Sequence, residues 1–256
     1  MDIENLSSTK LYNFNSAGRV NFHPAALKSD FATVEAFKTL RSNLLFCGAD
    51  IKTIVITSAL ENEGKSTVAA ELAKSLAEIG KKTLMIDADM RKSVVLRRNL
   101  KAQNIMGLSE LLSDQATIEQ VLYNTQLTEF DIIFSGHFPP NPVELLSSPK
   151  FISLLEQFKS AYDFVIIDAP PLAPVIDAAV ISANCDGAIL VISPGKARIQ
   201  EALSVKEQLL KSGCKILGAV INQTNPKHRD LSAKKNYYYY GDSGKKKSKF
   251  KFNIGK

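Results

Sequence analysis

Short apolar runs alternate along the chain with longer segments that have helical periodicity. The runs are rich in Ile, Val and Leu and begin at Thr53, Thr83, Phe130, Phe164, Gly187 and Lys215. Runs of this kind are typical of parallel strands, which are covered on both faces. Between them, the segments 65–79, 143–159 and 197–211 place apolar residues three and four positions apart. The order strand, helix, strand predicts an α/β fold, a doubly wound and mostly parallel sheet with helices on both faces.

The two ends of the chain depart from this alternation. Residues 1–30 are mostly polar and without sustained periodicity, so we interpret them as an N-terminal arm, followed by a helix predicted at 31–46. The apolar pattern stops after Leu231, and the remainder is rich in tyrosine and lysine. We therefore expect one domain at 31–232 and a flexible tail at 233–256.

The net charge of +6 is concentrated in the tail. Residues 234–256 contain eight lysines and one acid, Asp242, and carry +7, so residues 1–233 carry about −1. A body without excess positive charge has no general affinity for polyanions, and we expect no nucleic-acid partner. The sequence has no signal-peptide pattern and no apolar run near the ~20 residues that a membrane span needs. We therefore predict a cytoplasmic protein.

A phosphate-binding loop is predicted at 58–67, where the sequence SALENEGKST joins the first apolar run to a helix. In such loops main-chain N–H groups and the helix N-terminus face the phosphates. Lys65 would reach the β- and γ-phosphates, and the Ser66 hydroxyl would bind Mg²⁺. ATP and Mg²⁺ are therefore the expected ligands. The expected nucleotide contacts are Ala59 at the usual first-glycine position, Glu63, Gly64, Lys65, Ser66 and Thr67.

Acidic residues follow two of the predicted strands. Alternation directs Asp87 and Asp89 to the carboxyl edge of the sheet, where ligands bind in open α/β folds. Asp168 ends the fourth run, and we interpret it as the Walker B aspartate. Beside a triphosphate, one carboxylate can bind magnesium while another accepts the proton of a hydroxyl group. These acids, together with Ser66, are the candidate metal-binding and catalytic residues.

Three motifs together closely resemble those of the bacterial tyrosine kinases that regulate capsular and exopolysaccharide synthesis. They are the P-loop, the strand end Asp87-Ala88-Asp89-Met90-Arg91 and the later Asp168-Ala169-Pro170-Pro171. The resemblance extends from about Phe31 to Tyr240. It implies an ATP:protein-tyrosine phosphotransferase in which Asp87 is the base toward tyrosine, while Asp89 and Asp168 organise magnesium. The chain departs from the family pattern at Lys38, Ser93 and Ala169, where arginine, proline, and serine or threonine are usual.

The same resemblance implies partners and acceptor sites. Protein tyrosines are the substrates, among them those of the chain's own tail, Tyr237, Tyr238, Tyr239 and Tyr240. The helix that bears Glu35, Lys38 and Arg41 would join copies into a homo-oligomer, a ring. Tyr237 lies six residues past Leu231, a reach of at most ~20 Å, so we expect the tail to be phosphorylated by a neighbouring chain. The Gram-positive form of the family is recruited to the membrane by the cytoplasmic end of a separate adaptor protein. Without the resemblance, the charges on this helix favour a solvated helix face.

Partitioning or cell-division-positioning ATPases share this nucleotide fold and form the main alternative class. Those proteins typically carry an additional lysine directly after the first P-loop position, where this chain has Leu60. They also have no need of a tyrosine cluster, so the kinase interpretation is favoured. A non-catalytic nucleotide-binding adaptor is a third class, and the complete set of P-loop and strand-end residues argues against it. Asn222 matches an asparagine that lies near adenine in this fold class, and it is equally a strand-end turn candidate.

Overall fold

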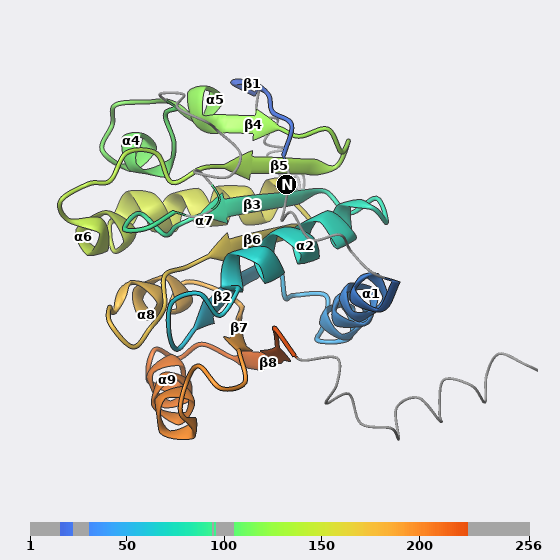
Figure 1. The fold of residues 1–256 in the computed structure, drawn as a ribbon. Helices are drawn as coiled ribbons and strands as arrows, with labels where there is room; N and C mark the ends of the chain where they lie inside the picture. Colours follow the sequence, from blue (N-terminus) through green and yellow to red (C-terminus); the bar gives the residue numbers. More distant parts are fainter. Residues whose placement is uncertain (1–15, 23–30, 94, 96–104, 225–256) are drawn as a thin grey trace, which may run out of the picture. The chain divides into compact units, whose positions relative to one another are not determined.

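A mixed sheet organises the described residues of the computed structural model, which are 16–22, 31–93, 95 and 105–224 (Figure 1). Eight strands in this part of the chain form one sheet in the order β1-β4-β5-β3-β6-β2-β7-β8. The strands are β1 Gly18–Arg19, β2 Thr53–Ser58, β3 Thr83–Asp87, β4 Leu122–Asn124, β5 Phe130–Ile133, β6 Phe164–Asp168, β7 Gly187–Ile192 and β8 Ile216–Ile221. β4 pairs antiparallel with β5, and the other neighbouring strands are parallel. The predicted mostly parallel sheet is confirmed.

Helices cover both faces of this sheet. They are α1 Phe31–Leu45, α2 Lys65–Ala77, α4 Leu108–Leu112, α5 Ile118–Val121, α6 Pro142–Leu146, α7 Pro149–Ala161, α8 Asp177–Ser182 and α9 Ile199–Lys211. Within the described segments, none is long and apolar enough to cross a membrane. Ile54 and Ile56 of β2 lie in a buried cluster with Leu72 of α2, whereas Val55 belongs to a second cluster. The second cluster includes side chains of α4 and α6–α9, so alternate strand residues face different helices, as predicted.

Two predicted segments have different boundaries in the structure. The helix expected at 143–159 is divided into α6 and α7. Pro149 cannot continue a helix, and Ser148 Oγ accepts a hydrogen bond from Phe151 N at 3.2 Å, which caps the start of α7. Part of the predicted arm joins the sheet, because β1 pairs with β4 and Phe22 is buried in the core. A two-residue strand is defined by its partner and has no periodicity of its own.

The carboxyl ends of β2, β3 and β6 lie side by side, and this arrangement positions the site. β6 is hydrogen bonded to both β2 and β3. In this register Asp87, the last residue of β3, lies opposite Asp168, the last residue of β6. The loop between β2 and α2 begins at the same edge.

Candidate active site

The predicted P-loop contains two residues in the left-handed region of backbone conformations. Gly64, immediately before α2, has a φ of 88°, and Asn62 has a φ of 62°. Glycine adopts this region without strain, and asparagine is among the few other residues that tolerate it. A side chain at position 64 is also excluded by space, because a Cβ there would lie 2.1 Å from Asn222 Nδ2. The loop therefore depends on Gly64 for its path into the helix.

Ala59 and Glu63 join the P-loop to neighbouring segments through hydrogen bonds. Both residues are fully buried. The Glu63 carboxylate accepts hydrogen bonds from Leu60 N at 2.8 Å and from Ser193 N at 3.0 Å. The Ala59 carbonyl accepts one from Ala173 N at 3.2 Å. A contact of either residue with a nucleotide would therefore use its main chain.

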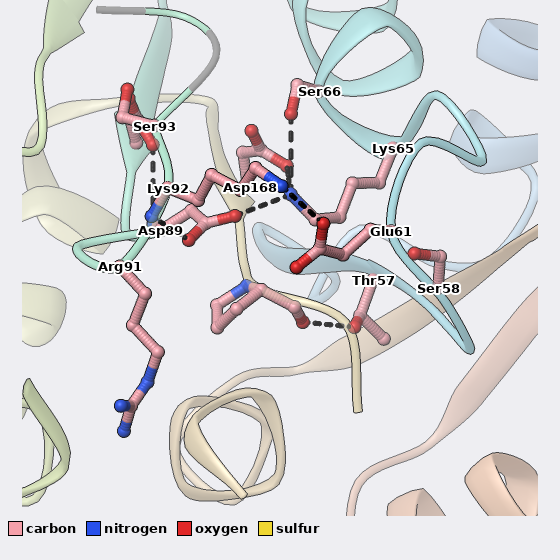
Figure 2. Close-up of polar contacts among 12 residues, drawn as sticks. Thr57, Ser58, Glu61, Lys65, Ser66, Asp89, Arg91, Lys92, Ser93 and Asp168 are labelled. Atoms are coloured by element: carbon pink, nitrogen blue, oxygen red, sulfur yellow. Dashed lines mark hydrogen bonds and ion pairs between the residues drawn. The ribbon is translucent and has the colours of Figure 1, made fainter. Parts of the chain in front are cut away.

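Lys65 lies at the centre of a buried charged cluster at the carboxyl edge (Figure 2). Its Nζ is 2.8 Å from Asp89 Oδ2 and 3.7 Å from Asp168 Oδ1. Asp87 Oδ1 accepts a hydrogen bond from Asp89 N at 3.2 Å, and Asp87 Oδ2 accepts one from Ser93 Oγ. The structure thus brings the P-loop lysine and the three predicted acids together.

Burial and mutual repulsion change the proton affinities in this cluster. Burial first, and then the charge of Asp168, raise the pKa of Asp87 to about 8. Burial also raises the pKa of Asp168, although Lys65 opposes this shift. Burial alone would lower the pKa of Lys65, but Asp168 and Asp89 outweigh it and raise that pKa. Lys65 therefore stays protonated, while Asp87 can take up or release a proton near neutral pH, as a general base must.

The cluster has unused capacity to bind a cation. Both carboxylate oxygens of Asp168 are buried and have no hydrogen-bond partner among the described residues. Asp168 Oδ1 has only the ion pair with Lys65 at 3.7 Å. Buried oxygens without a hydrogen bond are costly unless a ligand engages them, and carboxylates are preferred ligands of Mg²⁺. Within the same residues no group of three His, Cys, Asp or Glu side chains has metal-binding geometry. Mg²⁺ is usually held by one or two carboxylates together with phosphate oxygens and water.

A cavity of about 420 Å³ borders the cluster. Its walls come from the P-loop, the start of α2, the segment after β3, the proline-rich segment after β6 and the end of β8. The lining residues are Glu61, Asn62, Gly64, Lys65, Ser66, Thr67, Asp89, Arg91, Lys92, Pro170, Pro171, Pro174, Val175, Lys196 and Gln223. A volume of this size is typical of small-molecule sites. The cavity therefore places a ligand against the P-loop lysine and Asp89.

Comparisons with known proteins identify the class to which this arrangement belongs. The AAA domain family model matches residues 51–223. The tyrosine-protein kinase CpsD of Streptococcus agalactiae is 37% identical over 233 residues, which cover 91% of this chain and 99% of that protein. The chain belongs to this family of bacterial tyrosine-protein kinases. The crystal structure of the chimerical protein CapA2B2 matches the kinase with a TM-score of 0.72 at 34% identity, over 82% of this chain and 95% of its own.

The nucleotide fold of the kinase is also shared with a positioning protein. The septum site-determining protein MinD from Pyrococcus horikoshii OT3, solved in complex with Mg-ADP, matches with a TM-score of 0.59 at 28% identity. That match covers 70% of this chain and 73% of MinD, which is less than the kinase match covers. The shared P-loop fold supports nucleotide binding, and the broader match favours the kinases over the positioning ATPases.

Two further side chains of the kinase hold the segment after β3 in place. Arg91 donates two hydrogen bonds to the buried carboxylate of Asp177, at 2.8 and 3.1 Å, and so ties the segment after β3 to the start of α8. Ser93, a buried residue of the same segment, donates a hydrogen bond from Oγ to Asp87 Oδ2. Arg91 and Asp177 are 86 residues apart in sequence. No local pattern therefore indicates the Arg91 contact, whereas Ser93 stands out only as a departure from the family's proline.

The end of β8 packs on the P-loop of the kinase. Asn222 Nδ2 donates to the Glu63 carbonyl at 2.8 Å. Gln223, which lines the cavity, donates from Nε2 to the Asn62 carbonyl at 3.0 Å. The position of Asn222 near adenine stays a prediction, and its contact with the P-loop is a role that the sequence alone did not indicate.

The predicted interface residues do not form one outward-facing stripe on α1. Glu35 and Lys38 pair with each other at 2.7 Å on the surface. Arg41 Nη1 instead donates to Ser75 of α2, at 2.8 Å to the carbonyl and 3.1 Å to Oγ. Arg41 is therefore held against α2 of its own chain, and a role of all three residues in association stays a prediction. Tyr237–Tyr240 lie outside the described residues.

Proposed function

We propose that this chain is an ATP-dependent protein-tyrosine kinase that phosphorylates the tyrosine cluster of its own tail. The observation that carries the proposal is the pairing of two buried strand-end aspartates, Asp87 and Asp168, beside the P-loop Lys65. Negative charges next to phosphates weaken phosphate binding, so affinity alone does not explain them. An acid with a raised pKa at this position suits a group that accepts a proton during transfer.

The described residues divide the work of phosphoryl transfer. As the tyrosine oxygen forms its bond to the terminal phosphorus of ATP, the bond from that phosphorus to ADP breaks and the hydroxyl proton passes to Asp87. Lys65 offsets the negative charge of the transferred group. Ser66, Asp89 and Asp168, with Asp87 beside them, would hold Mg²⁺, which when bound adds positive charge at the phosphates. Gly64 and Thr67 place main-chain N–H groups at the start of α2.

Transfer between chains within a homo-oligomer is the proposed route. Support comes from α1, where Phe31 is 72% exposed and Val34 is 38% exposed, next to the surface pair Glu35 and Lys38. Phe46, directly after this helix, is 84% exposed. Large exposed apolar side chains are typical of an association surface, and here they lie at both ends of α1. A ring built through α1 would bring the tail of one chain to the active site of another.

Mixed oligomers test this route. A Lys65→Met chain with an intact tail is mixed with an active chain in which Tyr237, Tyr238, Tyr239 and Tyr240 are phenylalanine. Phosphotyrosine should appear on the inactive chain. If it stays unmodified while the wild type labels itself at a rate independent of protein concentration, transfer occurs within one chain.

Association through α1 has its own test. Replacing Glu35 and Lys38 by alanine should lower the mass measured by light scattering and slow autophosphorylation, because both residues are on the outer surface. Arg41→Ala is the matched control, since Arg41 contacts α2 of its own chain. Arg41→Ala should lower stability more than it changes mass. An unchanged mass in the double variant would contradict the proposed interface.

We place this kinase in the control of capsular or exopolysaccharide synthesis, as the motifs of its family suggest. The proposed arrangement is cytoplasmic, with recruitment to the membrane by the cytoplasmic end of a separate adaptor protein. Adding candidate adaptor peptides to the protein with ATP and Mg²⁺ should raise phosphotyrosine formation. Phosphosite mapping then shows which tyrosines of the chain and of added substrates are used.

The second candidate function is that of a positioning ATPase. The match to MinD is the observation that supports it. The two functions differ in their product. A kinase forms phosphotyrosine, whereas a switch ATPase releases phosphate in response to a partner without modifying tyrosine. Leu60 stands where the ATPases typically carry their additional lysine, so we expect phosphotyrosine.

A further inference from the structure

The P-loop of this kinase carries a carboxylate at the mouth of the phosphate cavity. Glu61 lines the cavity three residues before Gly64, and its side chain is 51% exposed. P-loops bind phosphates through N–H groups and a helix N-terminus, so a negative side chain opposes the ligand of the loop. Lys92 offsets this charge, with its Nζ 2.5 Å from Glu61 Oε2 (Figure 2).

Lys92 extends from the segment that carries the catalytic acids. Its main-chain N–H donates to Asp89 Oδ1 at 3.0 Å, while Asp89 Oδ2 accepts from Lys65 at 2.8 Å. The backbone of Lys92 is therefore held at the end of the cavity that Asp89 lines. The terminal phosphate of ATP belongs at this end because it is the group that reacts. From here the Lys92 side chain reaches across to the P-loop.

Two of the other cations that line the cavity, Lys65 and Arg91, are held more tightly. Lys65 and Arg91 are each bound to a carboxylate whose side chain is only 5% or 1% exposed. Lys196 donates to a main-chain carbonyl of the P-loop. The Lys92–Glu61 pair is exposed at both ends, at 53% and 51%, and exposed ion pairs are screened by water and open at little cost. Among the lining cations that pair with a carboxylate, Lys92 is thus the one that can exchange its partner most readily.

We propose that Lys92 is a phosphate-binding residue that exchanges Glu61 for the terminal phosphate of ATP. Glu61 is the counter-ion of Lys92 before the nucleotide arrives, and it competes with the phosphate for the same ammonium group. The pair thereby makes the site selective for the triphosphate over the diphosphate, since ADP offers no terminal phosphate to replace Glu61. This inference rests on the proposed binding of the phosphates at the P-loop.

A structural role for the same pair predicts a different pattern. If the ion pair only joins the P-loop to the segment after β3, removing either partner breaks the same bond and has the same effect on nucleotide affinity. If Lys92 binds phosphate, the two substitutions act in opposite directions. Lys92→Gln removes a phosphate contact, whereas Glu61→Gln removes a competitor and a repulsive charge.

The test is the affinity of the full chain for β,γ-methylene-ATP and for ADP, each with Mg²⁺, measured by isothermal titration calorimetry. Lys92→Gln should weaken binding of the ATP analogue about 10-fold and change ADP affinity by less than about 2-fold. Glu61→Gln should strengthen binding of the ATP analogue about 3-fold or more. In the double variant the loss caused by Lys92→Gln should persist.

Lys74→Gln and Glu78→Gln are the matched controls. These residues form an exposed pair on α2 and just after it, and Glu78 is about 20 Å along the helix axis from Lys65. Both controls should bind nucleotide as the wild type does. Equal losses in Lys92→Gln and Glu61→Gln, or equal losses for ATP analogue and ADP, would overturn the inference. A wild-type chain that binds neither nucleotide would instead refute the proposed function.

Discussion

Two charged clusters at opposite edges of the same sheet use their carboxylates in opposite ways. At the amino edge, Asp186 Oδ2 accepts from Lys52 N, Thr53 N and Thr53 Oγ1 at 2.9, 2.8 and 2.9 Å, and Oδ1 binds Lys159. Burial would raise the pKa of Asp186, but Lys159 and these hydrogen bonds overcome it and lower that pKa. At the carboxyl edge, Asp168 has no hydrogen-bond partner among the described residues, and burial raises its pKa.

The difference separates an acid that builds the fold from acids kept for a ligand. Asp186 joins β2, β7 and α7, and each of its oxygens has a donor within the chain. Asp87 accepts hydrogen bonds from Asp89 N and Ser93 Oγ, and Asp168 pairs with Lys65, yet burial still raises the pKa of both acids and Asp168 repels Asp87. Their arrangement lowers the stability of the folded state, and such a cost persists where a function requires it.

The largest effect should follow from removing the cation of the carboxyl edge. Lys65→Met should reduce phosphotyrosine formation by about 10³-fold or more, because Lys65 offsets the charge of the transferred phosphoryl group. Lys159→Met removes the cation of the amino edge and is the matched control. It should lower thermal stability and leave transfer unchanged. Full activity of Lys65→Met, assayed by phosphotyrosine detection, would contradict the P-loop assignment.

Asp87→Asn should separate catalysis from stability. Transfer should fall by about 10²-fold while nucleotide binding is kept, since amide nitrogen does not accept the hydroxyl proton. If binding and transfer fall together, Asp87 is a magnesium ligand.

The free energy of unfolding of Asp87→Asn should rise by a few kcal/mol at pH 8, because a buried repulsive charge is removed. Asp87 has a folded pKa of about 8 against 3.8 unfolded, so this gain is absent below pH 3.8 and grows as the pH rises to about 8.

Asp186→Asn should have the opposite profile. The variant places an NH₂ group among donors, so the free energy of unfolding should fall by about 1–3 kcal/mol while transfer is unchanged. The pKa of Asp186 is lowered below 3.8, so its stabilisation is present at neutral pH and is lost as the pH falls through the folded pKa. Chemical denaturation at pH 7 and near pH 3 measures this. A gap between variant and wild type that does not narrow in acid would refute the hydrogen-bond argument.

The sequence predicts the acids at the carboxyl edge of the sheet better than the acid at the amino edge. Asp87 and Asp168 could be found because each ends a continuous apolar strand, and parallel strands bring their carboxyl ends together. Asp186 shows no such signal, since its donors Lys52 and Thr53 lie more than 130 residues away. The same holds for Glu63, whose bond to Ser193 spans 130 residues.

The sequence likewise predicted part of the fold and missed part of it. The six apolar runs correspond to β2, β3 and β5–β8. A strand buried on both faces needs apolar residues at nearly every position, which accounts for the first five, whereas β8 at the sheet edge is partly exposed. β1 and β4 were missed, since they are only two and three residues long and take their definition from pairing. The division between α6 and α7 was missed although Ser148 and Pro149 are a recognisable helix start.

The smallest effect should follow from Ser135→Ala, which tests whether unused buried oxygens alone mark a ligand site. Ser135 Oγ, like the carboxylate of Asp168, is buried without a hydrogen-bond partner among the described residues. A neutral hydroxyl loses far less on burial than a carboxylate, and Ser135 does not line the nucleotide cavity. We therefore expect transfer within about 2-fold of the wild type and a free energy of unfolding unchanged or up to ~1 kcal/mol higher. Asp168→Asn, measured beside it, should lose most transfer because it removes a proposed magnesium ligand. A 10-fold loss of transfer in Ser135→Ala would extend the functional site to the end of β5.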